Sequence, residues 1–226
     1  GPQALTTPGA EEWYLRTPDT VSLYIREFGR GEPVIVLHGG WGMDHGYMLA
    51  ALNGLGGVAH FVIYDQRGSM RSPAPPAKIS VDKHVEDLDL LRQRLGLTRV
   101  TILGHSMGTF LAQAYLEAHP EHVKGLILVG AIPPVSDSAN NALGSANRVG
   151  TRLASRPEVD EELRRQGLLD KTDLTDQEAT RQWRIRFAGV NLYHVDRWGS
   201  MEGGPVFYSQ GAANASSGTI ASPWSF

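Results

Sequence analysis

The sequence lacks cysteine, an excess of basic residues and long apolar runs, and each absence excludes a class of function. With no cysteine among 226 residues, disulfides, thiolate metal sites and cysteine nucleophiles are excluded. The 21 Lys and Arg against 24 Asp and Glu give a formal net charge of -3, which offers no basic surface to a nucleic acid. No stretch approaches the roughly 18 apolar residues of a membrane-spanning helix. We therefore expect a globular protein that binds neither nucleic acid nor membrane.

Cofactor motifs are absent as well. No metal, nucleotide or flavin motif is visible, so we expect no cofactor and no metal. The chain opens with Gly1-Pro2 and no methionine, as after cleavage of a tag. We expect a cytoplasmic protein, and this start leaves export open.

Short apolar runs alternate with helical patterns between residues 20 and 130, which is typical of parallel strands joined by helices. Ser80 is expected to cap a helix that ends before Gly96, and a second helix is expected from Ser106 to Pro120. The fold class predicted is α/β, with a mostly parallel sheet and helices on both faces. The five predicted strands are residues 21–28, 33–38, 60–65, 100–105 and 123–130.

The residue pattern of the chain changes after Pro133-Pro134. Residues 138–200 are polar, charged and helical in pattern, which indicates an inserted helical cap. We expect a core domain over 10–132, the cap over 133–220 and the start of a further core segment over 221–226. The last stretch, 203–226, is small and polar, and we expect it to be mostly loop.

Ser106 stands in the pattern G-x-S-x-G, between an apolar run and a helical pattern. A serine nucleophile must be exposed on a sharp turn, and Gly104 and Gly108 leave room for one on either side. The pattern predicts a catalytic elbow at Ser106, with a plain tight turn as the alternative.

Glycines follow the strand predicted over 33–38, in "HGGWG". Backbone N–H groups there are expected to face a cavity, so Gly40 or Trp41 would donate one hydrogen bond to an oxyanion and Met107 the other. His38 and Gly39 are expected to support this loop. A third stretch, "DQRGSMRS", follows the strand over 60–65, and we expect Asp65 and Arg67 to form an ion pair that fixes it.

Together, "HGGWG", "DQRGSMRS" and "GHSMG" resemble the alpha/beta-hydrolase superfamily and, within it, the proline iminopeptidase-like branch. Trp41 stands where this branch usually has proline, and Met70 where it often has glycine. The resemblance implies an alpha/beta-hydrolase fold, with a helical cap after the sixth strand that shapes the substrate pocket. It also implies that a cap carboxylate holds the substrate amine, and Glu202 is the candidate.

The resemblance further implies a catalytic acid and then a histidine after Ser106, in Gly-x-x-Asp and Gly-His turns. Neither turn is present. His119 and His122 are interpreted as solvated surface groups, and His194 with Asp196 is a weak replacement pair because i and i+2 do not share a helix face. We expect instead that the chain stops short of its last core strands, leaving the strand over 123–130 at an open edge. Another chain, either a C-terminal fragment or a second copy, is expected to cover that edge.

The leading hypothesis is a serine hydrolase that cleaves a small amide or ester through an acyl-enzyme on Ser106, as a proline iminopeptidase-type aminopeptidase. An esterase or lactonase with the same machinery is the alternative, because Trp41 beside the nucleophile would suit an apolar acyl group. A catalytically incomplete fragment that only binds a ligand or partner is the third. The elbow serine argues against epoxide hydrolase chemistry, which uses an aspartate there.

Overall fold

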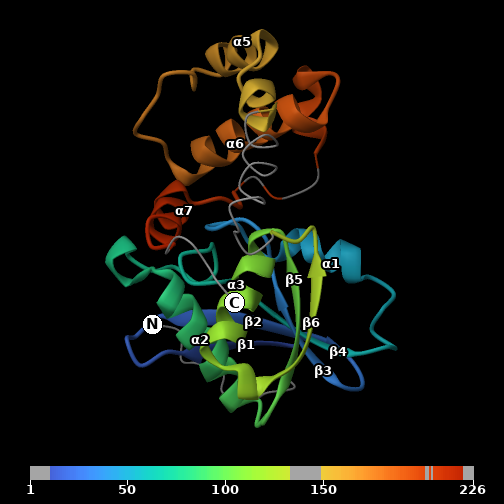
Figure 1. The fold of residues 1–226 in the computed structure, drawn as a ribbon. Coiled ribbons are helices and arrows are strands. Elements are labelled where there is room, and N and C mark those ends of the chain that lie inside the picture. The colour runs from blue at the N-terminus through green and yellow to red at the C-terminus, as the bar shows by residue number, and fades with distance from the viewer. Residues whose placement is uncertain (1–10, 133–148, 202–203, 205, 221–226) are drawn as a thin grey trace. The chain divides into compact units, whose positions relative to one another are not determined.

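The computed structural model describes residues 11–132, 149–201, 204 and 206–220, which form two compact units. Of these residues, the first unit contains 11–132 and 209–220, and the second contains 149–201, 204 and 206–208. Figure 1 labels their helices and strands.

The first unit is built on a six-stranded sheet of order β1-β2-β4-β3-β5-β6. Strands β3, β4, β5 and β6 are parallel, whereas β2 runs antiparallel to both β1 and β4. All five predicted strands are present, and the mostly parallel α/β sheet is confirmed. The bounds are β1 Glu12–Arg16, β2 Ser22–Gly29, β3 Pro33–Leu37, β4 His60–Tyr64, β5 Val100–His105 and β6 Val123–Val129.

Strand β1 was not predicted. It has only five residues, yet Trp13 and Leu15 are buried and alternate with neighbours that are exposed or partly exposed. A run this short carries too few alternations to be distinguished from a loop by pattern alone.

Helices pack on the sheet as the apolar stripes predict. Ser80 caps α2 (Val81–Arg94) by accepting a hydrogen bond from the Lys83 N–H, and α3 (Met107–Ala118) ends just before Pro120. These two helices contact each other (Figure 1). Helix α1 (Gly46–Leu52) contributes Met48 and Leu52 to a core shared with β3 and β4. The short 3-10 turns are η1 (Pro76–Lys78) and η2 (Pro120–His122).

Residues 209–220 differ from the expectation of a loop within the cap. Ser209 accepts a hydrogen bond from the Ala212 N–H and caps helix α7 (Gln210–Ser217). This helix belongs to the first unit, so the compact second unit ends earlier than residue 220. Small residues made the stretch resemble a loop, but their size is what permits the close packing described below.

The second unit is helical, as its sequence pattern predicts. It contains α5 (Pro157–Arg165), α6 (Asp176–Asn191) and η3 (Val195–Ser200). Its own core includes Val159, Leu163, Leu168, Ile185, Ala188 and Val195. Thr175 and Glu178 form a reciprocal capping box at the start of α6. In the described parts of both units, every helix is too short or too polar to cross a membrane.

Strand β6 lies at the edge of the sheet. It pairs with β5 on one side, and within the described residues no strand pairs with its other side. The side chains of Ile127, Leu128 and Val129 are 46%, 37% and 48% exposed. The predicted open edge is therefore observed in this part of the chain.

Candidate active site

Ser106 occupies a strained turn between β5 and α3. Its φ of 51° and ψ of -119° are unfavourable for a residue with a side chain, and such strain persists only where the surroundings impose it. The Ser106 N–H donates to the Val129 carbonyl of β6 at 3.0 Å, and its own carbonyl accepts from the Thr109 N–H at 2.8 Å. The turn is thus held from both the sheet and the helix.

Three glycines enclose this turn because no side chain would fit. A Cβ on Gly104 would lie 2.5 Å from the Gly108 carbonyl oxygen, and a Cβ on Gly108 would lie 2.3 Å from that of Leu37. A Cβ on Gly39 would come within 2.9 Å of the Ser106 Cβ. The "HGGWG" loop therefore passes directly beside the serine.

The backbone around Ser106 has the form expected of an oxyanion-binding loop. Gly40 and Gly42 adopt φ values of 68° and 78°, and the Met43 N–H closes a turn onto the Gly40 carbonyl. Met107 is the first residue of α3, so its N–H has no acceptor within the helix, and the helix dipole favours an anion there. The oxyanion roles of Gly40, Trp41 and Met107 stay predictions.

His38 is buried and has a structural set of contacts. The Gln66 N–H donates to its Nε2 at 3.1 Å, so its Nδ1 carries the proton and donates to the Gly39 carbonyl at 3.0 Å. Burial lowers the pKa of His38, which keeps the imidazole neutral. These contacts join the "HGGWG" loop to the loop that follows β4.

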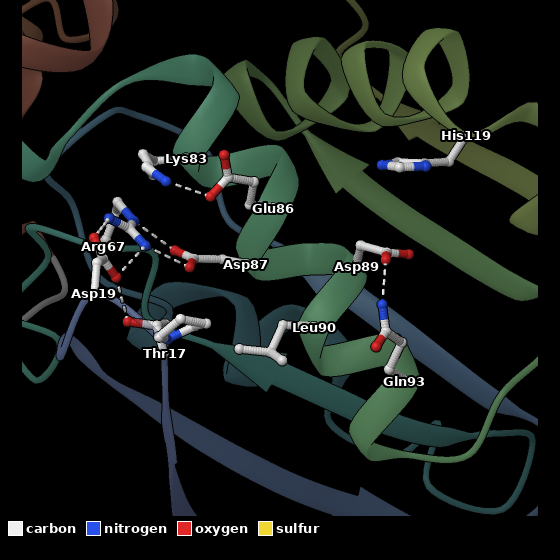
Figure 2. Close-up of a pocket in the computed structure, with 11 residues that line it drawn as sticks. Thr17, Asp19, Arg67, Lys83, Glu86, Asp87, Asp89, Leu90, Gln93 and His119 are labelled. Carbon is white, nitrogen blue, oxygen red and sulfur yellow. Dashed lines mark hydrogen bonds and ion pairs between the residues drawn. The ribbon is translucent and has the colours of Figure 1, made fainter.

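The predicted ion pair between Asp65 and Arg67 is wrong. Asp65 accepts from both the backbone N–H and the Nδ1 of His45, at 3.0 and 2.6 Å. Arg67 instead donates to Asp87 of α2 and to Asp19, with its nearest contacts to them at 2.6 and 2.8 Å. Figure 2 shows the Arg67 guanidinium between these two carboxylates. Both partners are distant in sequence, so proximity along the chain pointed to the wrong one.

Trp41 packs away from solvent. Its side chain is 5% exposed, stacks on the His84 ring at 4.7 Å and meets the Phe110 ring edge-on at 6.2 Å. The expectation that the Trp41 indole suits an apolar acyl group therefore loses its basis, because the ring anchors the loop instead. His84 in turn places Nε2 2.9 Å from the Ser216 hydroxyl of α7.

Helix α7 packs against the "HGGWG" loop. The Ser209 N–H donates to the Gly42 carbonyl at 2.9 Å, and a Cβ on Gly42 would lie 2.3 Å from the Ser209 oxygen. A Cβ on Gly68 would lie 2.6 Å from the Ala212 Cβ. Helix α7 thus packs against both the "HGGWG" loop and the "DQRGSMRS" loop. The sequence motifs did not predict this contact.

Tyr47 is a site residue that the motifs did not reveal. Its hydroxyl accepts the Gly39 N–H at 2.6 Å and lies 2.7 Å from Nδ1 of His105, the residue before the serine. Burial raises the pKa of Tyr47 to about 12, so the phenol stays protonated. It links the "HGGWG" loop to the elbow from the start of α1, and only the folded chain brings these residues together.

A base for Ser106 is not found among the histidines of the first unit. None of these seven, all described, hydrogen-bonds to the Ser106 hydroxyl: His38, His45, His60, His84, His105, His119 and His122. The pairing of His194 with Asp196, both in the second unit, stays a prediction. Glu202 lies outside the described residues.

The family is shown by comparison with known proteins. A model described as the alpha/beta hydrolase fold matches residues 32–201, which is more than half of the chain. The chain belongs to this family, as the three motifs predict.

Among curated relatives, the chain is similar to proline iminopeptidases. It is 45% identical over 103 residues to that of Heyndrickxia coagulans, an alignment covering 45% of this chain and 35% of the relative. It is 34% identical over 144 residues to that of Neisseria gonorrhoeae, covering 60% and 46%. The matched parts therefore span less than half of these relatives' own lengths.

Solved structures agree on the fold. A hydrolase from Pseudomonas aeruginosa PA01 matches with a TM-score of 0.60 at 20% identity, covering 92% of this chain and 71% of that one. A thermophilic esterase from Thermogutta terrifontis matches with a TM-score of 0.50 at 26% identity, covering 68% and 58%. The first of these likenesses concerns the fold alone.

Proposed function

We propose that this protein is a serine hydrolase that cleaves a small amide or ester through an acyl-enzyme on Ser106. The observation that carries the proposal is the strained backbone of Ser106, packed against Gly39 of a glycine-rich loop. Strain at a serine between a buried strand and a helix is typical of a nucleophile elbow. The structural role alone would not require a serine there.

The substrate we propose is an amide with a free amino-terminal proline, as for the proline iminopeptidases to which the chain is similar. An esterase or lactonase is the alternative. The likeness to the Thermogutta terrifontis esterase favours it, since that match covers 68% of this chain.

The base and acid are proposed to come from a further chain, with His194 and Asp196 of the second unit as the weaker alternative. A further chain has an attachment point at β6, whose edge is open and apolar. Strand β6 also holds the Ser106 N–H through Val129, so a chain that pairs with β6 would lie close to the elbow.

Labelling with a fluorophosphonate probe tests whether Ser106 is activated. The mass added to the purified chain is measured and located by peptide mapping, with Ser106→Ala and, in the second unit, Ser155→Ala as paired variants. Labelling at Ser106 that Ser155→Ala retains supports an activated serine. No labelling of a folded sample, judged by circular dichroism, would sink the proposal for this chain alone.

A comparison of substrates tests the finer proposal. Prolyl p-nitroanilide and p-nitrophenyl butyrate are assayed with the same protein, and Ser106→Ala corrects for background. Preference for the prolyl amide supports the aminopeptidase, and turnover of the ester alone supports the esterase.

A further inference from the structure

A second cluster of chemically capable side chains lies at the opposite end of α3 from Ser106. Asp89 of α2, His119 at the end of α3 and His122 of η2 place one donor atom each within 4.8 Å of one another. Ser106 precedes the first residue of α3, whose 12 residues span about 18 Å, so the cluster is separate from the elbow.

The ring of His122 is oriented by a backbone carbonyl. Its Nδ1 lies 3.2 Å from the Thr98 carbonyl, which only accepts, so Nδ1 carries the proton and Nε2 has the lone pair. A metal-binding histidine usually has this kind of backbone partner on its other nitrogen. His119 is also held, because its ring packs on that of Tyr115 at 5.1 Å.

The expectation that these two histidines are solvated surface groups is therefore only half right. Their side chains are 32% and 29% exposed, and each has a partner. The Nε2 lone pair of His122 lies 3.4 Å from a carboxylate oxygen of Glu121, and Nδ1 of His119 lies 3.9 Å from the same oxygen.

Asp89 is oriented by its own hydrogen bonds. Its Oδ1 accepts from Arg92 and from the Tyr115 hydroxyl, each at 2.8 Å, and its Oδ2 accepts from Gln93 at 2.6 Å. Ligating carboxylates are commonly held in this way. Asp89 and His119 also line an open hollow of about 340 Å³, so an ion reaches them from solvent (Figure 2).

The donor set selects the class of ion. Two imidazoles and one carboxylate suit Zn²⁺ and related transition metals, which accept four ligands and can take the fourth from water. Mg²⁺ and Ca²⁺ need six or more oxygen ligands, and the Arg92 guanidinium already neutralises part of the Asp89 charge.

We propose that Asp89, His119 and His122 bind one Zn²⁺-class ion. The ion would join α2 to the turn between α3 and β6. The proposal is independent of the chemistry at Ser106. A short sequence motif could not predict this site, because Asp89 lies thirty residues before His119 in the sequence.

Isothermal titration with ZnCl₂ tests the site on protein without a histidine tag or chelator. We expect one saturable site, weakened at least about tenfold by His119→Ala and by His122→Ala, and unchanged in the matched variant His194→Ala. MgCl₂ and CaCl₂ are expected to give no binding heat. Absence of saturable Zn²⁺ binding, or equal affinity in the double variant His119→Ala/His122→Ala, would overturn the proposal.

A second measurement needs no variant and so does not depend on how the variants fold. Diethyl pyrocarbonate modification of the wild-type chain is followed by mass spectrometry with and without Zn²⁺. We expect the ion to slow modification of His119 and His122 at least about tenfold and to leave that of exposed histidines elsewhere unchanged. Equal rates at both residues with and without Zn²⁺ would contradict the proposal.

Discussion

Strand β5 has two neighbours, and they differ sharply. On one side, β3 leads into the "HGGWG" loop, which Tyr47, Gln66 and α7 fasten by hydrogen bonds. On the other side, β6 supports the Ser106 N–H but exposes apolar side chains to solvent. The elbow thus depends on one strand that is packed on both sides and one strand, β6, whose outer edge is unpaired within the described residues. A strained turn can therefore be held firmly even where one of its supporting strands has an open edge.

The largest effect on stability is expected at Gly108, which packs against the end of β3. In Gly108→Ala the new methyl group would meet the Leu37 and His38 carbonyl oxygens at 2.3 and 2.9 Å, which are backbone atoms of the neighbouring strand end. We expect a loss of about 3 kcal/mol in the free energy of unfolding, measured by urea denaturation.

The matched control lies on the open strand. A methyl group on Gly125 of β6 would meet nothing within 4 Å, so Gly125→Ala is expected to change stability by less than about 1 kcal/mol. Equal losses in the free energy of unfolding of Gly108→Ala and Gly125→Ala would contradict the proposed difference between the two strands.

Acid is expected to destabilise the fold through His84, which stacks on Trp41 of the "HGGWG" loop. Burial, and secondarily the charge of Arg67, lower the pKa of His84 from 6.5 to about 3. Below pH 6.5 the unfolded chain binds a proton at His84, whereas the folded chain does not until the pH approaches 3. The contribution of neutral His84 to the free energy of unfolding is therefore fully present above pH 6.5 and is lost as the pH falls toward 3. Between pH 6.5 and about pH 5 the loss is about 2 kcal/mol, measurable by urea denaturation.

The variant His84→Gln isolates this residue from the carboxylates. It removes the titrating ring, so its stability is expected to fall less steeply over the same pH range. Parallel profiles for the two proteins would assign the acid sensitivity to other groups. Hydrogen exchange of residues 210–217 would show in addition whether α7 is released.

A smaller effect is expected at Tyr47. The change Tyr47→Phe removes the hydroxyl that accepts the Gly39 N–H, at a cost of about 1 kcal/mol in the free energy of unfolding. If Ser106 reacts with fluorophosphonate, the labelling rate should fall as well, because the loop beside it is less well fixed. Tyr193→Phe, on a side chain that is 90% exposed, is the control and should leave both quantities unchanged.

The smallest change in stability is expected on the open strand. The double variant Ile127→Thr/Val129→Thr keeps β-branched side chains at two exposed positions, so stability should change by less than about 0.5 kcal/mol. Self-association, followed by sedimentation velocity, should decrease because the edge is less apolar. Undiminished association would mean that chains meet through another surface.

Local patterns were sufficient for much of this fold. Buried parallel strands and amphipathic helices repeat at short periods, so the five strands, the Ser80 cap and the ends of α2 and α3 were predicted from neighbouring residues. Strand β1 and helix α7 were missed because one is short and the other is built from small residues. The Arg67 pairing failed because its carboxylate partners come from other parts of the chain.

The sequence by itself determined the family and the position of the elbow, since a tight turn needs particular residues at fixed, close spacing. Only the tertiary structure decided what surrounds that turn: the Tyr47 link, the burial of Trp41 under His84, and the α7 contacts. It also brought Asp89, His119 and His122 together. Hydrogen bonds, ring stacking and metal ligation act over a few ångströms in space, and long-range packing alone sets which distant residues come that close.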